Sequence, residues 1–365
     1  MPTDAAVPNT GLFCAQAPLR SMIGPPGKMI ETPALLEESA VDPLSDVLRV
    51  ARLKGGVFLH AEFTAPWCIA SQMTPQLCLP FMQPAEHLIP YHYVVDGECF
   101  VRTEREPSKV HRLQAGEVVV VPHNDVHLLG SEFSCTPILA SDLIKPPGES
   151  GLFSISHGGG GRPVKIVCGF LGCDGARTNP VLSTLPSLLV LNIDEAGGAE
   201  WIRSTFQFAA NEVAGGRPGS EAVLAKLSEL LFVDTVRRYA ETLPEGQTGW
   251  LAGLRDAFVA RALSLFHGDV ARAWTIDDLA HEVGLSRSAL ADRFVRLLGQ
   301  PPIQYLYHWR MQIAAQELRN SSASLAQIAL SVGYDSEAAF SRAFKKAYGS
   351  APASWRRTAL TREAA

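Results

Sequence analysis

Residues 328–356 read IALSVGYDSEAAFSRAFKKAYGSAPASWR, and this stretch decides the fold of the last third of the chain. Phe340 and Phe344 lie four residues apart, so a helix would place both on one apolar face. Arg342 and Lys345 fall outside that face. They form either an ordinary solvated surface or a surface that contacts a partner, and the rest of the sequence has to distinguish the two.

The same pattern occurs twice, as TIDDLAHEVGLSRSALADRFVRLLG and as SLAQIALSVGYDSEAAFSRAFKKAYG. Gly284 of the first copy aligns with Gly333 of the second at an offset of 49 residues. The second copy then carries one extra residue in its turn, so Gly299 aligns with Gly349 at an offset of 50. One helical hairpin with a glycine turn is weak evidence, but two copies joined by a long helical stretch are far more specific.

Each copy contains the residues that a helix-turn-helix unit requires. Ser and Thr at the helix starts can accept hydrogen bonds from the first backbone N–H groups. Small residues allow two helices to cross closely, and glycine permits a left-handed turn. The predicted N-caps are Thr275, Ser286, Ser324 and Ser336, with Gln327 completing a capping box at Ser324, and the small crossing residues are Ala280 and Ala329.

The stretch from about residue 256 to 358 resembles the DNA-binding domain of the AraC/XylS family of bacterial transcription regulators. The likeness includes the family's C-terminal signature with its Gly349-x-x-Pro352 step, and Trp355-Arg356 where the family commonly has Tyr-Arg. It implies two recognition helices, joined by PIQYLYHWRMQIAAQELRN, that enter adjacent major grooves recurring about every 34 Å. The implied partners are double-stranded promoter DNA and, for an activator, RNA polymerase.

The helical period separates buried from exposed positions on the two recognition helices. We expect core stripes of Leu290, Phe294 and Leu297 in the first helix and of Phe340, Phe344 and Ala347 in the second. The opposite faces are expected to meet DNA. The predicted DNA-binding residues are Arg287, Ser288, Ala291, Asp292 and Arg296, then Glu337, Ala338, Ser341, Arg342 and Lys345, and Arg310 in the joining helix.

Arg342 is the best candidate for a base contact, because a guanidinium can bond O6 and N7 of guanine together. Ser341 and Lys345 suit phosphate contacts. Asp292 either accepts from cytosine N4 or pairs with a nearby arginine of the chain. Arg310 either contacts a phosphate or bonds the end of a neighbouring helix.

The first half of the chain has a different pattern. Between about residues 46 and 195, short apolar runs alternate with Gly, Pro and Asp, which predicts an antiparallel sandwich or barrel. In YHYVVDGECFVR, Asp96-Gly97 predicts a tight hairpin turn. After Leu191 the spacing of apolar residues becomes that of helices.

The segment LQAGEVVVVPHNDVHLL has the spacing G-x5-P-x-N-x-x-H, from Gly116 to His127. It resembles the second motif of cupin barrels, with Asn124 where many cupins have Gly. The wider stretch from about 46 to 190, which includes VCGFLGCD, resembles the cupin-like sensor domain of one branch of the same regulator family. The resemblance implies a barrel whose interior holds a small effector molecule.

We therefore predict four segments: an irregular tail (1–40), a cupin-like antiparallel β-barrel sensor domain (41–198), a helical linker or dimerisation segment (199–249) and an all-α domain with two helix-turn-helix units (250–360). The middle helices suit dimerisation in the family, and packing within the chain is an equally serious interpretation. We expect a homodimer, in which a signal in the barrel alters the spacing of two DNA-binding units.

The cupin resemblance raises the question of a metal. His127 matches the last ligand of a catalytic cupin, but the first motif lacks its His-x-His pair, and Pro90 stands near the position of its Glu. His87 and His92 would suit iron, nickel or zinc, yet a competent site needs a near-complete ligand set, so we predict no metal and no other cofactor. The groups expected to reach an effector are Trp67, His87, Tyr91, His92, Tyr93 and His127, with ordinary core packing as the alternative for each aromatic ring.

Seven cysteines are scattered over the first half of the chain without a CxxC pair, which argues against a disulfide scaffold and a zinc ribbon. The resemblance makes Cys168 and Cys173, in and after the VCG segment, candidate redox thiols. A sensor thiol has to be exposed and have a lowered pKa. The alternative is that both are small buried hydrophobes.

Composition fits a folded protein, with 47% hydrophobic and 19% charged residues. The net charge of −5 is unevenly distributed, because residues 256–365 carry +3 and residues 1–255 carry −8. Only the C-terminal third therefore has the sign that favours nucleic acid. The sequence has no run of eighteen apolar residues and no signal-peptide pattern at its N-terminus, so we expect a cytoplasmic protein that does not associate with membranes.

These patterns predict a ligand- or redox-responsive transcription regulator that is not an enzyme. The alternative is a metal-dependent cupin enzyme, a dioxygenase or an isomerase, whose helical part only assembles it. Fold alone does not decide between them. Stoichiometric iron or nickel held through His127 would favour the enzyme.

Overall fold

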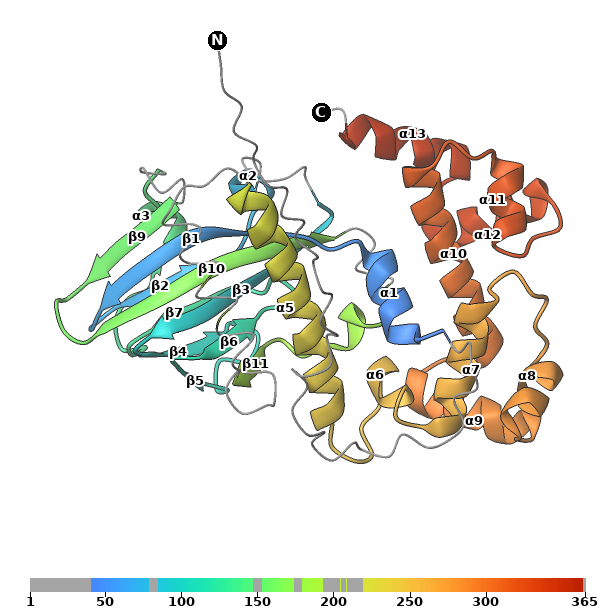
Figure 1. The fold of residues 1–365 in the computed structure, drawn as a ribbon, viewed down its shortest axis with the longest axis horizontal. Helices are drawn as coiled ribbons and strands as arrows, with labels where there is room; N and C mark the ends of the chain where they lie inside the picture. Colours follow the sequence, from blue (N-terminus) through green and yellow to red (C-terminus); the bar gives the residue numbers. More distant parts are fainter. Residues whose placement is uncertain are drawn as a thin grey trace, which may run out of the picture. The chain divides into compact units, whose positions relative to one another are not determined.

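The computed structural model describes residues 41–78, 85–146, 153–173, 179–192, 204, 208 and 219–363. The predicted tail and most of the predicted helix over residues 199–213 lie outside these ranges. Within them, strands occupy the first half of the chain and helices the second, as the change of spacing after Leu191 predicts (Figure 1).

The strands form two sheets that pack face to face (Figure 1). The first has the order β11-β6-β3-β10-β1-β9 and the second the order β5-β4-β7-β2-β8. Their bounds are β1 (Lys54–Thr64), β2 (Cys68–Ser71), β3 (His87–Asp96), β4 (Glu98–Thr103), β5 (His111–Gln114), β6 (Glu117–Val120), β7 (His127–Gly130), β8 (Ile138–Leu139), β9 (Phe153–Gly158), β10 (Pro163–Cys173) and β11 (Leu189–Asn192).

The predicted cupin-like fold is confirmed, in the form of a two-sheet sandwich. Strand pairing is antiparallel except between β1 and β9 and between β2 and β8, which run parallel. Because side chains alternate along a strand, one face of each sheet lies in the core between them. Phe63, Val101 and Ile166 are among the fully buried members of this core.

The hairpin predicted at Asp96-Gly97 is wrong. β3 pairs with β6 and β10, whereas β4 pairs with β5 and β7, so the two strands belong to different sheets. Gly97 has φ +83°, and a side chain there would lie 2.6 Å from the carbonyl oxygen of Pro163. The glycine is therefore needed for a corner that leads the chain from one sheet to the other.

A long helix, α5 (Ser220–Thr242), lies across the outer face of the first sheet (Figure 1). Leu224 and Phe232 of α5 are buried with Tyr91 and Leu171 of the sheet. Gly55 of β1 allows this close approach, since a Cβ at Gly55 would lie 2.7 Å from a Leu171 methyl and 2.9 Å from the Cβ of Ser228.

The remaining helices include short ones in the sheet region and a continuous series after residue 250. They are α1 (Pro43–Ala51), α2 (Pro75–Cys78), α3 (Ala140–Leu143), the 3₁₀ turn η1 (Leu182–Thr184), α6 (Trp250–Gly253), α7 (Ala257–Gly268), α8 (Ile276–Val283), α9 (Arg287–Leu298), α10 (Pro302–Asn320), α11 (Leu325–Ser331), α12 (Glu337–Tyr348) and α13 (Pro352–Glu363). No described helix is long and apolar enough to cross a lipid bilayer.

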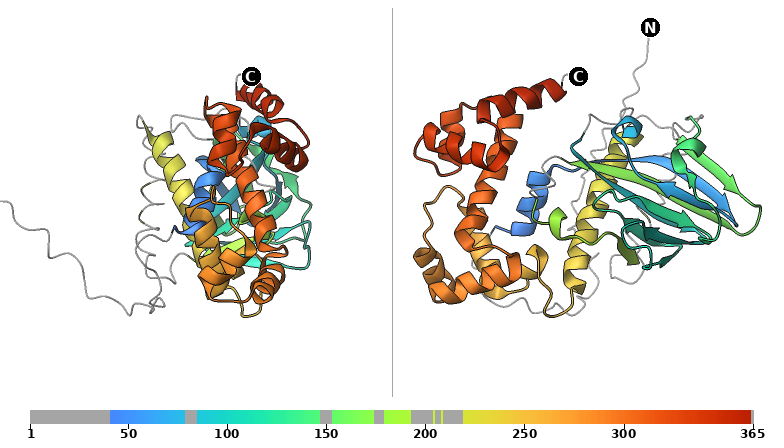
Figure 2. Two further views of the ribbon diagram at one scale, coloured as in Figure 1. Left: turned by 90° about the vertical axis from the view of Figure 1, so that its right-hand side faces the viewer. Right: turned by 180° about the vertical axis from the view of Figure 1, so that it is seen from behind.

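The helical third contains two cores joined by α10. Figure 2 shows α8 and α9 near one end of α10, and α11 and α12 near the other. Tyr305, Leu306 and Trp309 of α10 are buried in the first core, and Met311 and Leu318 are buried in the second. The predicted internal repeat is therefore confirmed as two helix-turn-helix units that share one helix.

Candidate DNA interface and effector pocket

Each recognition helix begins at a serine cap. The hydroxyl of Ser286 accepts a hydrogen bond from the backbone N–H of Ala289 at 3.2 Å, at the start of α9. The hydroxyl of Ser336 accepts from Ala339 at 3.3 Å, at the start of α12. Both predicted caps are confirmed, and they fix the end of each helix that would enter a groove first.

The helix before each recognition helix begins at a capping box. Ser324 and Gln327 form the predicted box on α11. Thr275, predicted as a simple cap, forms a second box with Asp278 on α8. The two units therefore start with the same local geometry.

The glycine turns have the predicted left-handed backbone, with φ +75° at Gly284 and +78° at Gly333. At Gly284 a Cβ would meet no atom within 4 Å. At Gly333 it would lie 2.5 Å from the carbonyl oxygen of Ala271, so the second turn requires glycine for space as well as for φ.

The apolar stripes of the recognition helices are buried, with one exception. Leu297 is half-buried, whereas Ala347 is exposed, so its predicted place in the core is wrong. Phe340, Phe344 and Tyr348 follow a spacing of four, and Tyr348 packs against Trp355 of α13 with ring centroids 4.7 Å apart. The residues with no exposed surface are Leu290, Phe294, Phe340 and Phe344.

The second recognition helix presents unpaired cations. Arg342 and Lys345 of α12 are exposed, and no hydrogen bond or ion pair is found for either side chain among the described residues. Glu337 and Ala338 are exposed at the start of the helix, and Ser341 is partly buried. The guanidinium of Arg342 is therefore available to a partner.

The first recognition helix presents a more mixed surface. Arg287 pairs with Asp277 of α8 at 3.2 Å, and both side chains are exposed. Asp292 is exposed and takes part in no ion pair of the described residues, so the predicted arginine partner is not found. Ser288 and Arg296 are exposed and Ala291 is half-buried.

Arg310 is not part of the exposed interface, which corrects its predicted phosphate contact. Its Nε donates to the carbonyl oxygen of Val270 at 2.9 Å, and its Nη2 donates to that of Arg272 at 2.7 Å. Weaker contacts reach the carbonyls of Ala271 and Gly333 at 3.4 Å. The guanidinium thus satisfies carbonyl groups that precede α8 and connects the first unit to the turn of the second.

The space between the two sheets contains a cavity of about 410 Å³. Its walls are mostly apolar and include residues of β1, β2, β3, β9, β10 and α3, with Ala61, Phe63, Ile155 and Ile166 among them. Polar side chains gather at the end of β2 and on the residues that lead from it into α2. They are Ser71, Gln72, Thr74 and Gln76.

A buried series of hydrogen bonds joins two residues of the cavity wall, His92 and Cys168, to His127 behind it. His127 Nδ1 lies 3.0 Å from the carbonyl oxygen of Asp125, so this nitrogen carries the proton and Nε2 accepts. His92 Nε2, at 2.8 Å, must then donate to His127, which leaves His92 Nδ1 to accept from the Cys168 thiol at 2.9 Å. Both imidazoles are therefore neutral, and the thiol is protonated.

The pKa directions agree with this assignment. Burial and the neighbouring His127 hold the pKa of His92 well below its usual range. Burial lowers the pKa of His127 to about 4. Burial raises the pKa of the Cys168 thiol. Each shift favours the uncharged form, as expected for groups out of contact with water.

The predicted effector residues separate into two groups. His92 lines the cavity, and His127 is bonded directly behind it. Tyr91 and Tyr93 alternate with His92 along β3 and face α5, where the Tyr91 hydroxyl donates to Ser228 at 2.6 Å. The strand alternation therefore removes both tyrosines from the cavity, which is the core-packing alternative.

Trp67 and His87 support the cavity without lining it. Trp67 stacks on Phe63 with ring centroids 4.0 Å apart, and Phe63 is a lining residue. His87 Nε2 donates to the carbonyl oxygen of Pro122 at 2.6 Å, and burial lowers the pKa of His87. His87 thus holds the cupin-like loop rather than a ligand.

The histidines do not fit the metal that the cupin fold suggests. Both nitrogens of His92 are engaged, by His127 and by Cys168, and His87 bonds a backbone carbonyl. Among the described residues, no group of three His, Cys, Asp or Glu side chains is placed to hold a metal ion. No step of the function is therefore assigned to a metal.

The two predicted redox thiols are buried. Cys168 exposes 6% and Cys173 exposes 2% of its surface. A buried, protonated thiol lacks the access and the lowered pKa that a sensor requires, so the structure contradicts the redox interpretation of Cys168. Cys173 also lies in the core, as a small hydrophobe does.

Comparison with known proteins agrees with both halves of this description. A cupin family model matches residues 42–241, and a helix-turn-helix domain model matches residues 279–358. An AraC-like transcription regulator of Streptomyces lividans is 30% identical over 87% of this chain and 98% of its own length. The regulator AlkR of Acinetobacter baylyi is 29% identical over 87% of this chain and 99% of its own.

This chain is an AraC family transcription regulator. The predicted family and the predicted function, DNA-dependent regulation of transcription, are thereby confirmed. Among solved structures, the DNA-binding domain of AdpA in complex with a target DNA has 27% identity and a TM-score of 0.28, over 29% of this chain and 96% of that domain.

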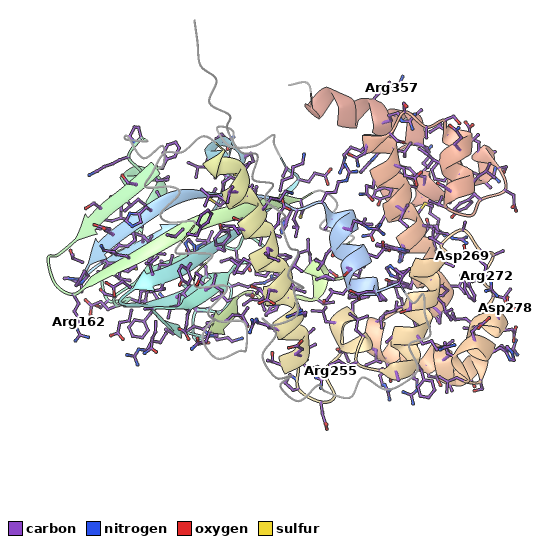
Figure 3. The ribbon with its side chains drawn as sticks, in the orientation of Figure 1. Arg162, Arg255, Asp269, Arg272, Asp278 and Arg357 are labelled. Carbon is purple, nitrogen blue, oxygen red and sulfur yellow. The ribbon has the colours of Figure 1, made fainter. Side chains whose placement is uncertain are left out.

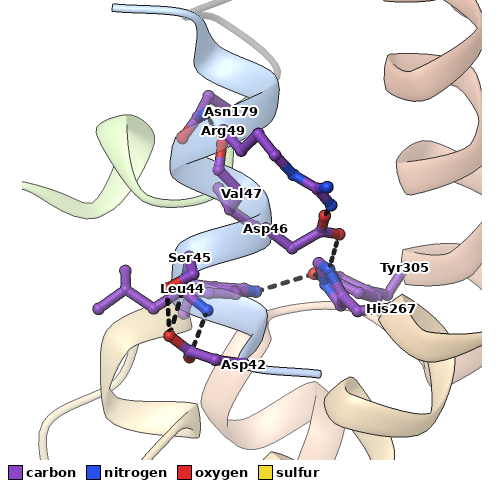
Figure 4. Close-up of polar contacts among 10 residues, drawn as sticks. Asp42, Leu44, Ser45, Asp46, Val47, Arg49, Asn179, His267 and Tyr305 are labelled. Atoms are coloured by element: carbon purple, nitrogen blue, oxygen red, sulfur yellow. Dashed lines mark hydrogen bonds and ion pairs between the residues drawn. The ribbon is translucent and has the colours of Figure 1, made fainter. Parts of the chain in front are cut away.

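A buried polar network connects α1 to the DNA-binding helices of this AraC family protein (Figure 4). Trp250 donates to the Tyr305 hydroxyl at 3.0 Å, and Tyr305 donates to His267 Nε2 at 2.8 Å. His267 Nδ1 donates to the Asp46 carboxylate at 2.7 Å. Trp250, Tyr305 and His267 each donate one hydrogen bond to the next group, and the Asp46 carboxylate accepts the last. The network is therefore complete with His267 neutral.

The charges of this pair follow from their surroundings. Burial lowers the pKa of His267, against the opposing effect of Asp46. Burial raises the pKa of Asp46, but hydrogen bonds from His267 and Arg49 outweigh it, so the pKa lies below its ordinary value. No sequence pattern indicates this site, because Asp46 and His267 are 221 residues apart and neither belongs to a motif.

Proposed function

We propose that this regulator binds promoter DNA through the exposed faces of α9 and α12, and that a small apolar molecule in the cupin cavity controls the binding. The protein acts in the cytoplasm, where bacterial DNA lies, as a homodimer and without enzymatic activity. As an activator it would also contact RNA polymerase. The DNA-contacting residues are Arg287, Ser288, Ala291, Asp292, Arg296, Glu337, Ala338, Ser341, Arg342 and Lys345.

The two recognition helices differ in what they offer to DNA. α12 has Arg342 and Lys345 without partners among the described residues, so neither has to break an ion pair in order to bind. On α9, Arg287 is already paired and Asp292 is acidic. We therefore assign most base discrimination to α12, and to Arg342 in particular.

The cavity supports the effector part of the proposal. Its volume of about 410 Å³ is in the range of small-molecule sites, and its walls are mostly apolar. The buried polar groups of the wall, His92 and Cys168, already bond to protein partners. A molecule with an apolar body and one polar end, directed at the polar segment after β2, fits this arrangement best.

One observation carries the proposed coupling between the two sites. β1 contributes Leu59, Ala61 and Phe63 to the cavity. Only two residues separate β1 from α1, and Asp46 of α1 accepts a hydrogen bond from His267 of α7. A ligand that moves β1 would therefore act on a helix fixed to the DNA-binding part, which is the differential contact that allostery requires.

The DNA part is tested with fluorescence anisotropy on the chain's own upstream region and on random DNA. Arg342→Ala should lose discrimination between the two, whereas Lys345→Ala should weaken both equally and reduce the salt slope by about 1. Arg162→Ala, at the turn between β9 and β10 (Figure 3), is the control that removes a charge elsewhere. If Arg342→Ala keeps full discrimination, the base contact is wrong.

The effector part is tested with straight-chain alcohols of increasing length as probes. Ala140 lies at the cavity wall, so Ala140→Trp should fill the space and abolish the rise in melting temperature that a fitting alcohol causes, whereas Ala140→Ser should keep it. Equal responses of the two variants would place the binding elsewhere. Metal analysis tests the enzyme alternative, because stoichiometric iron or nickel dependent on His127 would contradict the present proposal.

A further inference from the structure

The segment between β7 and β8 folds back over the outer face of the second sheet. Cys68 of β2 is directly opposite Gly130 of β7, which in turn is opposite Phe100 of β4. Since Ile69 faces the core between the sheets, Cys68 faces outward. Cys68 is nevertheless only 3% exposed, because residues 131–137 cover it.

Three contacts hold this segment in place. The backbone N–H of Trp67 donates to the Ser131 hydroxyl at 3.0 Å, and the N–H of Ser131 donates to the carbonyl oxygen of Trp67 at 3.0 Å. At Gly130 a Cβ would lie 2.7 Å from the carbonyl oxygen of Glu132, so glycine is needed for the sharp return. At the far end, Ile138 pairs with Ile69, the residue after Cys68.

Cys135 lies in this covering segment, next to Cys68. The Cys135 thiol donates to the carbonyl oxygen of Glu132 at 3.7 Å, and a Cβ at Gly130 would lie 2.7 Å from that oxygen and 3.3 Å from the Cα of Cys68. Cys135 is partly exposed, whereas Cys68 is buried. Burial and the neighbouring Cys135 raise the pKa of Cys68 to about 11, and Arg102 acts against this rise. Cys68 therefore stays protonated until its partner reacts, and Cys135 is the thiol that a solute reaches first.

An arginine without a full set of partners lies beside the pair. Arg102 of β4 is on the same outward face as Cys68, and its guanidinium lies over the ring of Phe133, 4.7 Å from the centroid. The Nε of Arg102 is buried, and no hydrogen-bond partner is found for it among the described residues. Arg102 also donates from Nη1 to the carbonyl oxygen of Pro107 at 3.2 Å, but it forms no ion pair among the described residues, so its positive charge opposes the rise in the pKa of Cys68.

We propose that Cys68 and Cys135 form a reversible disulfide when the protein meets a peroxide. The Cys135 thiolate attacks one peroxide oxygen, the O–O bond breaks, and the leaving hydroxide takes a proton to become water. Cys68 then attacks the sulfur of the Cys135 sulfenic acid, forms the S–S bond and displaces hydroxide, which leaves as water with the Cys68 proton. Two thiols are oxidised by two electrons, and one hydrogen peroxide is reduced to two waters.

The disulfide would act on the neighbouring cavity wall. Residues 131–137 lead directly into β8 and α3, and Leu139, Ala140 and Ser141 line the cavity. A bond from Cys135 to β2 closes this segment against the strand beside it. Oxidation is therefore a second input to the sensor domain, at a site separate from the buried Cys168.

Peptide mass spectrometry of the full chain tests the proposal, after treatment with hydrogen peroxide and blocking of the remaining thiols. A peptide pair linked through Cys68 and Cys135 should appear and should disappear on reduction with dithiothreitol. Cys135→Ser should lose it, and Cys99→Ser, a change at a thiol buried on the inner face, should keep it. In Cys68→Ser, Cys135 should instead be trapped as a sulfenic acid by dimedone.

Two further readouts keep the test independent of any one variant. Arg102→Gln should slow formation of the link, and hydrogen exchange over residues 131–143 should slow on oxidation of the natural protein but not of Cys135→Ser. Linkage of Cys135 to Cys14, or no linkage while free glutathione in the same tube is oxidised, would overturn the proposal. Unchanged exchange after full linkage would overturn its effect on the cavity wall.

Discussion

Replacing Asp46 tests whether the buried network between α1 and the DNA-binding helices works as described. The His267 side chain has no exposed surface, and the Asp46 side chain exposes only 7%. Asp46→Ala leaves the Nδ1 proton of His267 without an acceptor at this buried position. It also removes a carboxylate from the first turn of α1, where the helix dipole favours negative charge.

The size of the effect follows from these two losses. An unsatisfied buried donor costs about 1–3 kcal/mol, and the lost dipole contact about 0.3–1 kcal/mol. We therefore expect Asp46→Ala to lower the free energy of unfolding by about 1–4 kcal/mol. Asp46→Asn keeps an oxygen acceptor for His267, so it should cost less, about 1 kcal/mol, because His267 is neutral in the network.

Denaturant unfolding at neutral pH, followed by far-ultraviolet circular dichroism, measures these differences. Arg49→Ala is the matched control, because Arg49 also bonds Asp46 but its side chain is 76% exposed, and such a pair is worth about 0–1 kcal/mol. If Asp46→Asn were as damaging as Asp46→Ala, the charge would be essential. His267 would then be protonated and the proposed direction of the hydrogen bonds wrong.

Three further predictions concern the core, the turns and acid. Phe344→Ala should lower the free energy of unfolding by about 3–5 kcal/mol in a denaturant titration, since the ring is fully buried in the second core; a loss below 1 kcal/mol would contradict its packing role. Gly333→Ala should cost more than Gly284→Ala, because φ is the same but only Gly333 meets a backbone carbonyl; equal melting temperatures would refute this. Burial lowers the pKa of His127 to about 4, so the stability that the neutral imidazole contributes is complete above pH 6.5 and falls by about 3 kcal/mol as the pH drops towards 4. His127→Asn should flatten this part of the profile of unfolding free energy against pH. An unchanged profile would count against the neutral imidazole.

The parts of the structure that depend on neighbouring residues could be predicted from the sequence. Caps at Ser286, Ser324 and Ser336 and the turn at Gly333 are local, and all four are found where the repeat places them. The Thr275 capping box follows an equally local signal, the acidic residue three positions later, and could have been read in the same way.

Other features depend on contacts between distant parts of the chain. The alternation of β3 is visible in the sequence, but which of Tyr91 and His92 faces the cavity depends on α5 covering the opposite face. The predicted burial of Ala347 is wrong because Trp355, which is distant from the α12 pattern, packs against Tyr348 instead. Arg310 is charged and stands where the family has a basic residue, but the backbone carbonyls that bind it lie 38 to 40 residues earlier.

The two cores of the helical third meet within α10, between Trp309 and Met311. Each residue of an α-helix adds about 1.5 Å and 100°. One residue inserted at this junction would therefore swing one recognition helix about a third of a turn around the other. In the proposed complex, substitution of exposed side chains alone can change which operator sequence is recognised. The rotation of one recognition helix relative to the other is instead fixed by the number of residues in α10.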